Sequence, residues 1–209
     1  MEERVRKVRS DKKMGINPII SIELNDALAR LGYVCDRPVK DIGETLVVLA
    51  LNNREIINTI ARKFRRPYWY TDTIMINGDP ELPKMKWVIQ GDTVRPGLRF
   101  SQPHYEKISE LAYALDTSKI KAAALLLIYA THNEQCLSHL LTKYVKYQLD
   151  HRRMENLRRV VDYTNQGKPE QFQINIPILL NHIYYCMGDN VKPIGKAVSK
   201  WMSGLGLDS

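Results

Sequence analysis

The chain of 209 residues is poor in cysteine and has no long hydrophobic run. Its three cysteines, Cys35, Cys136 and Cys186, lie far apart and form no CxxC pair, a pattern typical of free thiols in a reducing compartment. No stretch of about 18 apolar residues is present, which excludes a transmembrane helix. The first residues, Met1–Lys7, lack the apolar core of a secretory signal. We therefore expect a cytoplasmic protein with no membrane partner.

Motifs of the common enzyme classes are also missing. The sequence contains no GxGxxG or GxxxxGK[ST] phosphate-binding loop, no HExxH metal motif and no GxSxG nucleophile motif. His132, Cys136 and His139 share one helical face, but a zinc site needs a fourth ligand and none is obvious nearby, so a structural role fits them better. The sequence thus predicts a protein that is not an enzyme and that uses no cofactor or metal ion.

Basic residues outnumber acidic ones by 31 to 23, which gives a net charge of +8. The rest of the composition, 44% hydrophobic and 26% charged, is that of an ordinary globular protein. The positive balance favours a polyanionic partner, although the position of the charge is more informative than its size. Residues 1–13 contain six Lys or Arg and almost no apolar residue, so we expect a basic arm over residues 1–16.

A pattern of one strand followed by two helices recurs three times. The first and third occurrences align without gaps and pair Ile20 with Phe172. The second aligns with the first at a spacing of 80 residues through its helices, where Leu31 meets Leu111, and at a spacing of 76 residues through its strand, where Ile22 meets Leu98. The difference of four residues is about one helical turn. Internal repeats of this kind are informative about the whole fold. The predicted fold is α+β and predominantly helical, with three tandem units joined by a β-hairpin linker and a long connecting helix.

The predicted boundaries follow from this repeat. The segments are the basic arm (1–16), unit 1 (17–62), the β-hairpin linker (63–94), unit 2 (95–133), the connecting helix (134–169) and unit 3 (170–209). The unit strands are predicted at 18–24, 98–100 and 171–176, and the linker hairpin joins 71–76 to 84–89 through Asn77-Gly78-Asp79-Pro80. Helices are predicted at 27–33 behind an Asn25-Asp26 cap, 39–61 with an interruption signal at Asn52-Asn53, 102–115 behind Ser101, 119–131, 134–163, 177–187 and 191–202.

Unit 2 resembles the ribbon-helix-helix family of DNA-binding repressors. The stretch that carries the resemblance is Leu98-Arg-Phe-Ser-Gln-Pro-His-Tyr-Glu-Lys-Ile-Ser-Glu-Leu-Ala-Tyr-Ala-Leu-Asp-Thr-Ser-Lys-Ile-Lys-Ala. It contains a strand with an outward Arg, a Ser cap, a Leu-Ala pair late in the first helix, and Ser-Lys at the start of the second. The resemblance implies that two units interlock, that their strands pair antiparallel, and that this two-stranded ribbon enters the major groove of DNA.

Side chains alternate along a strand, so inward residues would form the core and outward residues would face the bases. In unit 2, Leu98 and Phe100 are expected to point inward. Arginine suits guanine, whereas Asn and Gln suit adenine. The first strand would present Ile19, Ser21 and Glu23, so it is expected to be mainly a structural partner. The predicted base-reading residues are Arg95, Gly97, Arg99, Gln171, Gln173, Asn175 and Ser21.

The second helix of each unit would bind phosphate at its N-terminus, where free N–H groups carry partial positive charge. Such contacts fix the register on DNA without reading sequence. The basic run Arg62–Arg66, which precedes Tyr68-Trp69-Tyr70, would bind a nucleic-acid backbone. A solvated helix end is the simpler interpretation of this run. The predicted phosphate-binding residues are Thr117, Ser118, Lys119, Asn190, Lys192, Arg65 and Arg66.

The resulting prediction is a sequence-selective protein that binds double-stranded DNA, with transcriptional regulation as its main expected role. The same resemblance allows a plasmid or mobile-element accessory factor that acts in partition, copy control or transfer. A protein-interaction module, such as an antitoxin-like partner, is the alternative from another class. Because three strands cannot all pair within one chain, we also expect a homodimer or a higher oligomer.

Overall fold

The computed structural model describes residues 13–86, 88–145 and 149–187. Within them the chain is an α+β protein dominated by helices, with short two-stranded ladders. The helices are α1 (Ile22–Cys35), α2 (Val39–Asn52), α3 (Arg54–Ala61), α4 (Gln102–Ala114), α5 (Lys119–Thr131), α6 (Glu134–Tyr144), α7 (His151–Asn165) and α8 (Ile176–Met187). The strands are β1 (Met14–Ile16), β2 (Ile20–Ser21), β3 (Tyr68–Trp69), β4 (Met75–Ile76), β5 (Thr93–Val94) and β6 (Leu98–Phe100). None of these helices is long and apolar enough to cross a membrane.

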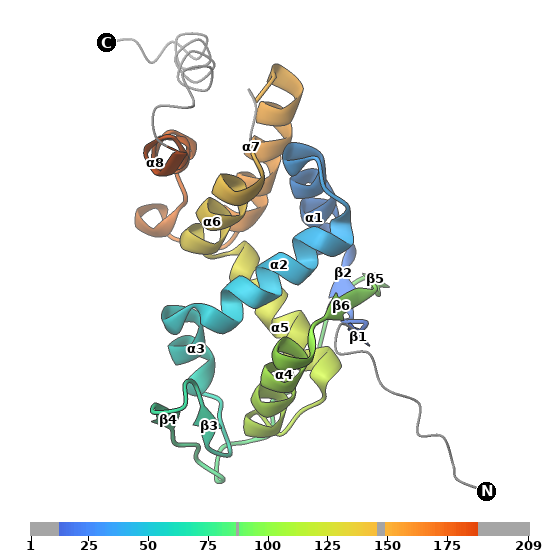
Figure 1. Ribbon diagram of the computed structural model, residues 1–209, viewed down its shortest axis with the longest axis vertical. Helices are drawn as coiled ribbons and strands as arrows, with labels where there is room; N and C mark the ends of the chain where they lie inside the picture. Colours follow the sequence, from blue (N-terminus) through green and yellow to red (C-terminus); the bar gives the residue numbers. More distant parts are fainter. Residues whose placement is uncertain (1–12, 87, 146–148, 188–209) are drawn as a thin grey trace, which may run out of the picture.

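Helices α2 and α5 cross at the centre of the molecule (Figure 1). Helix α5 is apolar around most of its circumference, and every residue of Ala122–Leu127 is buried. A helix of this composition has to be covered on all sides. Helices α2, α4 and α6 cover it, while α1 packs on α2 and α7, and α8 packs on α6.

Helices α1 to α3 repeat in α4 to α6 at a spacing of 80 residues. The turn after α1 and the turn after α4 are each made by an aspartate, Asp36 and Asp116, with φ of 52°. Two further counterparts, Asn53 and Asn133, cap α3 and α6, because each side-chain oxygen accepts a backbone N–H three residues ahead at 3.0 Å. The predicted alignment of Leu31 with Leu111 therefore extends through a third helix in each half.

The two halves contact one another reciprocally. The Nδ2 atom of Asn53 donates to Oε1 of Gln135 at 3.2 Å, and the Nδ2 atom of Asn133 donates to Oε2 of Glu55 at 3.5 Å. Gln135 is the counterpart of Glu55 at the same 80-residue spacing. Contacts in which each partner repeats the role of the other are the signature of a two-fold axis. An approximate two-fold axis thus relates α1–α3 to α4–α6.

The first strand lies earlier in the chain than predicted. Residues Met14–Ile16, which were expected in the basic arm, form β1 and pair antiparallel with β6. Segment 18–24 is not one strand, because the Oγ of Ser21 accepts the N–H of Leu24 at 3.2 Å and starts α1 there, not at Asn25-Asp26. Four residues, Asn17–Ile20, separate β1 from this cap, whereas Ser101 directly follows β6. The strands therefore correspond at a spacing of 84 residues, and the predicted spacing of 76 is wrong.

The linker forms a hairpin, but at a different place from the predicted one. Strand β3 pairs with β4, and β5 pairs with β2 of the first half, while the described residues of 84–89 contain no strand. The sequence Asn77-Gly78 is not the hairpin turn. Gly78 packs on the backbone of Arg66, where a Cβ would lie 2.4 Å from the Arg66 nitrogen, and the next N–H, of Asp79, donates to the Phe64 carbonyl at 2.8 Å.

The predicted connecting helix over 134–163 is two helices, α6 and α7. Val145 leaves the helical conformation, with a ψ of 96°, and Asp150 starts α7 by accepting the N–H of Arg153 at 2.8 Å. Leu149, just before this cap, is buried. A capping aspartate next to a buried leucine outweighs the continuous amphipathic pattern of the segment.

The third predicted strand is not formed. Glu170–Phe172 is a 3₁₀ turn that follows Pro169, and Phe172 is 65% exposed instead of inward. The side chain of Asn165 accepts the N–H of Ile174 at 2.7 Å and donates to its carbonyl at 2.9 Å, so it occupies the backbone groups that a neighbouring strand would use. The chain then enters α8. Asn190, Lys192 and the predicted helix 191–202 lie outside the described residues.

Replacing Asn165 tests this account of the 170–176 segment. We expect Asn165→Ala to lower the free energy of unfolding by about 1–3 kcal/mol, because two partly buried backbone groups lose their partner. The measurement is urea unfolding followed by circular dichroism. Asn58→Ala, at an exposed position of α3, is the matched control and should stay close to the wild type. An Asn165→Ala variant as stable as the wild type would contradict this account.

Candidate nucleic-acid interface

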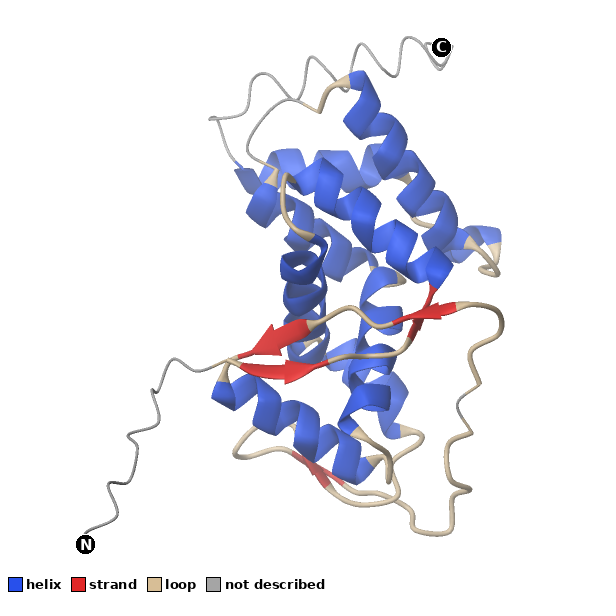
Figure 2. Ribbon diagram, turned by 90° about the vertical axis from the view of Figure 1, so that its right-hand side faces the viewer, coloured by secondary structure: helices blue, strands red, loops and turns tan. Residues whose placement is uncertain are grey.

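The two ladders β1–β6 and β2–β5 belong to one ribbon. Met14 lies opposite Phe100 and Ser21 lies opposite Thr93, so both ladders have the same register. This register places Pro18 opposite Pro96. Because proline has no N–H to donate, the proline pair interrupts the hydrogen bonding and divides the ribbon into two ladders. Figure 2 shows the ladders following one another across one side of the helices.

Side chains alternate along this ribbon between the core and the surface. The inner residues Ile16, Ile20, Leu98 and Phe100 are at most 5% exposed, and the predicted inward direction of Leu98 and Phe100 is confirmed. Pro18 is buried between them. Of the outer positions, Ile19 and Ser21 are only partly exposed, whereas Gly15, Asn17, Thr93, Arg95, Gly97 and Arg99 are exposed. We call these six exposed residues the outer ribbon face.

Three of the predicted base-reading residues lie on the outer ribbon face. They are Arg95, Gly97 and Arg99, and within the described chain the guanidinium groups of the two arginines form no hydrogen bond or ion pair. Ser21 lies on the same side of the ribbon, but it is only partly exposed and its Oγ caps α1. Its observed role is therefore that of a helix cap.

The other three predicted readers are not part of the ribbon. Gln171 and Gln173 lie in and just after the 3₁₀ turn, and Asn175 precedes α8. The Nε2 of Gln173 donates to the carbonyl of Lys168 at 3.3 Å, and the Asn175 carbonyl accepts the N–H of Leu179. Their alternating pattern predicts a strand, but the hydrogen bonds of Asn165 with the backbone of Ile174 prevent it.

A hollow of about 680 Å³ lies between the ribbon and the first turns of α2. Glu44 of α2 reaches into it, pairs with Lys13 at 3.0 Å and accepts the backbone N–H of Arg99 at 2.8 Å. This carboxylate satisfies an edge donor of β6 that has no strand partner, and so holds the ribbon on α2. Lys40 and Asp41 complete the charged lining.

Sequence reasoning missed the contribution of the first strand to this surface. Lys13 and Asn17 flank β1 and are exposed. Both were assigned elsewhere, Lys13 to the arm and Asn17 to the start of unit 1. The apolar residues Met14, Ile16, Pro18 and Ile20 occur at every second position, and this alternation is the signal that would have located the strand.

The N-terminus of α5 contains the predicted phosphate-binding residues Thr117, Ser118 and Lys119. The Oγ of Ser118 accepts the N–H of Lys121 at 3.3 Å and caps the helix. The ammonium of Lys119 donates to the Tyr105 hydroxyl at 2.7 Å and lies 4.4 Å from the centre of that ring. Ser118 is exposed, whereas Thr117 and Lys119 are half-buried. Phosphate binding at this position stays a prediction.

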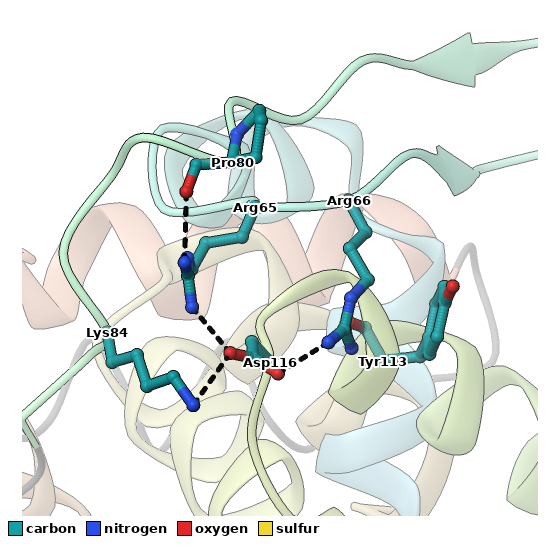
Figure 3. Close-up of polar contacts among 6 residues, drawn as sticks. All are labelled: Arg65, Arg66, Pro80, Lys84, Tyr113 and Asp116. Atoms are coloured by element: carbon teal, nitrogen blue, oxygen red, sulfur yellow. Dashed lines mark hydrogen bonds and ion pairs between the residues drawn. The ribbon is translucent and has the colours of Figure 1, made fainter.

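Arg65 and Arg66 have partners inside the protein. Both form ion pairs with Asp116, at 2.5 and 2.8 Å, and Lys84 approaches the same carboxylate at 3.3 Å (Figure 3). Arg65 also donates to the Pro80 carbonyl, and Arg66 stacks on Tyr113. Desolvation alone would raise the pKa of Asp116, but the Lys84 hydrogen bond and the three positive charges outweigh it and lower that pKa. These contacts fasten the linker to the α4–α5 turn, a structural role that the sequence did not predict.

Cys35 and Cys136 are buried, and His132 is partly buried. Burial raises the pKa of Cys35 and of Cys136 to about 12, so both thiols stay protonated. The Nδ1 of His132 lies 2.9 Å from the Ile128 carbonyl, and the ring packs against Tyr163. Within residues 13–86, 88–145 and 149–187, no group of three potential ligands is arranged to hold a metal ion.

Comparison of the chain with models of protein families, with curated proteins and with solved structures finds no match. A function for this chain is therefore inferred from its own geometry and sequence.

The Asp116 cluster makes stability depend on pH in a predictable direction. The lowered pKa means that the ionised carboxylate stabilises the fold above its unfolded-state pKa of about 3.8, and that this contribution is lost as the pH falls through the lower folded-state value. We expect Asp116→Asn to be less stable than the wild type at pH 7, and the gap to narrow below about pH 4. Asparagine tolerates the left-handed conformation, so the change isolates the charge.

The measurement is the free energy of unfolding in urea between pH 7 and pH 3. Asp36→Asn is the matched control, because Asp36 has the same φ of 52° and forms no ion pair within the described chain. A gap for Asp116→Asn that does not change with pH would show that the ion pairs do not stabilise the turn.

Proposed function

We propose that the two strand–helix–helix halves form a ribbon-helix-helix fold within one chain, and that the protein binds duplex DNA by placing the outer ribbon face in the major groove. Sequence-selective binding of this kind would serve a transcriptional regulator. A plasmid or mobile-element accessory factor would use the same contacts. The observation that carries the proposal is the ribbon itself, with one face buried in the core and the other presenting two arginines whose guanidinium groups have no partner among the described residues.

The chemistry of the outer ribbon face suits base recognition. Arg95 and Arg99 offer forked donors that match the O6 and N7 acceptors of guanine. Asn17 offers an amide that matches adenine, and its side-chain oxygen lies near Gly97, where a Cβ would be 3.7 Å away. Arg99 lies opposite Gly15 in the register. Because glycine has no side chain, the backbone opposite Arg99 and the backbone opposite Asn17 can approach the floor of the groove closely.

Residues around the ribbon support backbone contacts. Lys13 and Lys40 lie beside the outer ribbon face, and the chain as a whole has a net charge of +8. Ser118 would add a backbone N–H group at the start of α5, whereas the N–H of Thr117 already donates to the Ala112 carbonyl at 2.9 Å. Such contacts supply affinity and register but no sequence information.

The third predicted strand, on which the prediction of a homodimer is based, is not observed in the described residues. That prediction depends on a strand left without a partner, and the described residues of 170–187 contain no strand. The strands that pair are β1 and β6 of the same chain.

Salt dependence tests whether the protein binds DNA at all. We expect clear affinity for duplex DNA at 50 mM salt and a loss of roughly 10³-fold by 200 mM, because phosphate contacts release counterions. The measurement is fluorescence anisotropy with a labelled duplex. Absence of binding at 50 mM salt, or affinity that hardly changes with salt, would reject the DNA-binding function and favour a protein partner.

Substitution of the arginines tests whether the ribbon reads bases. We expect Arg95→Ala and Arg99→Ala each to reduce the discrimination between a selected site and a scrambled duplex by about 1–3 kcal/mol. Arg158→Ala removes the same charge from an exposed position of α7 and is the matched control. It should leave discrimination unchanged. If all three variants weaken binding to both duplexes equally, the arginines contact phosphates and the ribbon does not read sequence.

A further inference from the structure

The geometry of the ribbon points to a more specific target than duplex DNA in general. We propose that one chain binds one site, and that this site is not an inverted repeat. The inference rests on the proposed function, since it concerns which DNA the outer ribbon face recognises.

The first step is that one chain supplies both halves of an approximate two-fold arrangement. The axis passes between the reciprocal pairs formed by Asn53 with Gln135 and by Asn133 with Glu55. It also passes near the central ribbon pair, Gly15 and Arg99, which are counterparts at the 84-residue spacing of the strands. Two identical units related in this way would require an inverted repeat in the DNA.

The second step is that the two strands present different chemistry to the groove. Arg99 projects from one strand, whereas its counterpart Gly15 has no side chain at all. Both glycine and arginine at this position are exposed. One DNA half-site would thus face the side chain of Arg99, and the other half-site would face only the backbone at Gly15. The two half-sites are therefore recognised differently.

The third step is that the ribbon is longer at one end. Beyond Ile16, residues Asn17–Ser21 continue in register with 93–97 and include the Pro18–Pro96 pair and the β2–β5 ladder. Beyond Phe100, Ser101 ends the ribbon at once and starts α4. Five residues of strand extend about 17 Å, roughly half of one duplex turn. Arg95 lies on this extension, so the contacts of the extended end have no counterpart at the other end.

The test is selection of binding sites from a random duplex library with the full-length protein, together with the mass of the complex by native mass spectrometry. We expect a motif without inverted symmetry and one chain per duplex. We expect Arg95→Ala to abolish base preference at one flank only, and Arg99→Ala to abolish it near the centre. A palindromic motif, or two chains on each selected duplex, would overturn the inference while leaving DNA binding intact. Failure to enrich any motif would instead reject sequence-selective binding itself.

A second variant approaches the same question from the opposite direction. Gly15→Arg introduces an arginine at the counterpart of Arg99. Gly15 is exposed, and a Cβ built there would lie no closer than 3.9 Å to another atom. We expect the selected motif of this variant to gain symmetry around the centre, while Gly15→Ala, the matched control, keeps the motif of the wild type. On a duplex made symmetrical by inverting the Arg99 half, Gly15→Arg should bind roughly 5- to 150-fold more tightly than Gly15→Ala. Equal affinities would contradict the assignment of Gly15 and Arg99 as counterparts that face DNA.

Discussion

The pairing of β1 with β6 is the contact on which the rest of this structure depends. Neither strand can exist alone, because an isolated strand leaves both edges of its backbone unpaired. Their pairing brings together segments about 80 residues apart and places Ile16, Leu98 and Phe100 over the crossing helices α2 and α5. The approximate two-fold arrangement, the hollow beside α2 and the outer ribbon face all follow from it.

The two halves depart from two-fold symmetry at the ribbon and at the turn that contains Asp116. The insertion of Asn17–Ile20 lengthens one end of the ribbon, and the facing prolines Pro18 and Pro96 interrupt the hydrogen bonding between the β1–β6 and β2–β5 ladders. The Asp116 ion pairs exist in one half only, since the counterpart turn at Asp36 forms none within the described chain. A fold built from two similar halves thus presents a surface with two different ends.

Local signals in the sequence predicted the second half well. The strand Leu98–Phe100, the helix behind Ser101 and the apolar helix Lys119–Thr131 are formed where capping residues and periodicity place them. The same signals failed at 171–176, where perfect alternation predicts a strand and Asn165 occupies the backbone of Ile174 instead. They failed again at Asn77-Gly78, where the glycine serves a close approach to Arg66 and makes no hairpin turn. In both cases a contact from elsewhere in the chain decided the conformation.

The sequence by itself determined the cap of α5 at Ser118, the start of α4 after Ser101 and the buried face of β6, because each depends on residues within a few positions of one another. It also determined the 80-residue spacing of the helices, because each copy carries its own local pattern. Only the tertiary structure decided which strand pairs with β6, that Arg65 and Arg66 form ion pairs with Asp116, and that Arg95 and Arg99 stay exposed on the outer ribbon face. Strand pairing and ion pairing join residues that are distant in the chain, and a strand accepts any partner whose alternation and backbone groups fit. The choice among such partners is made by the packing of the whole chain.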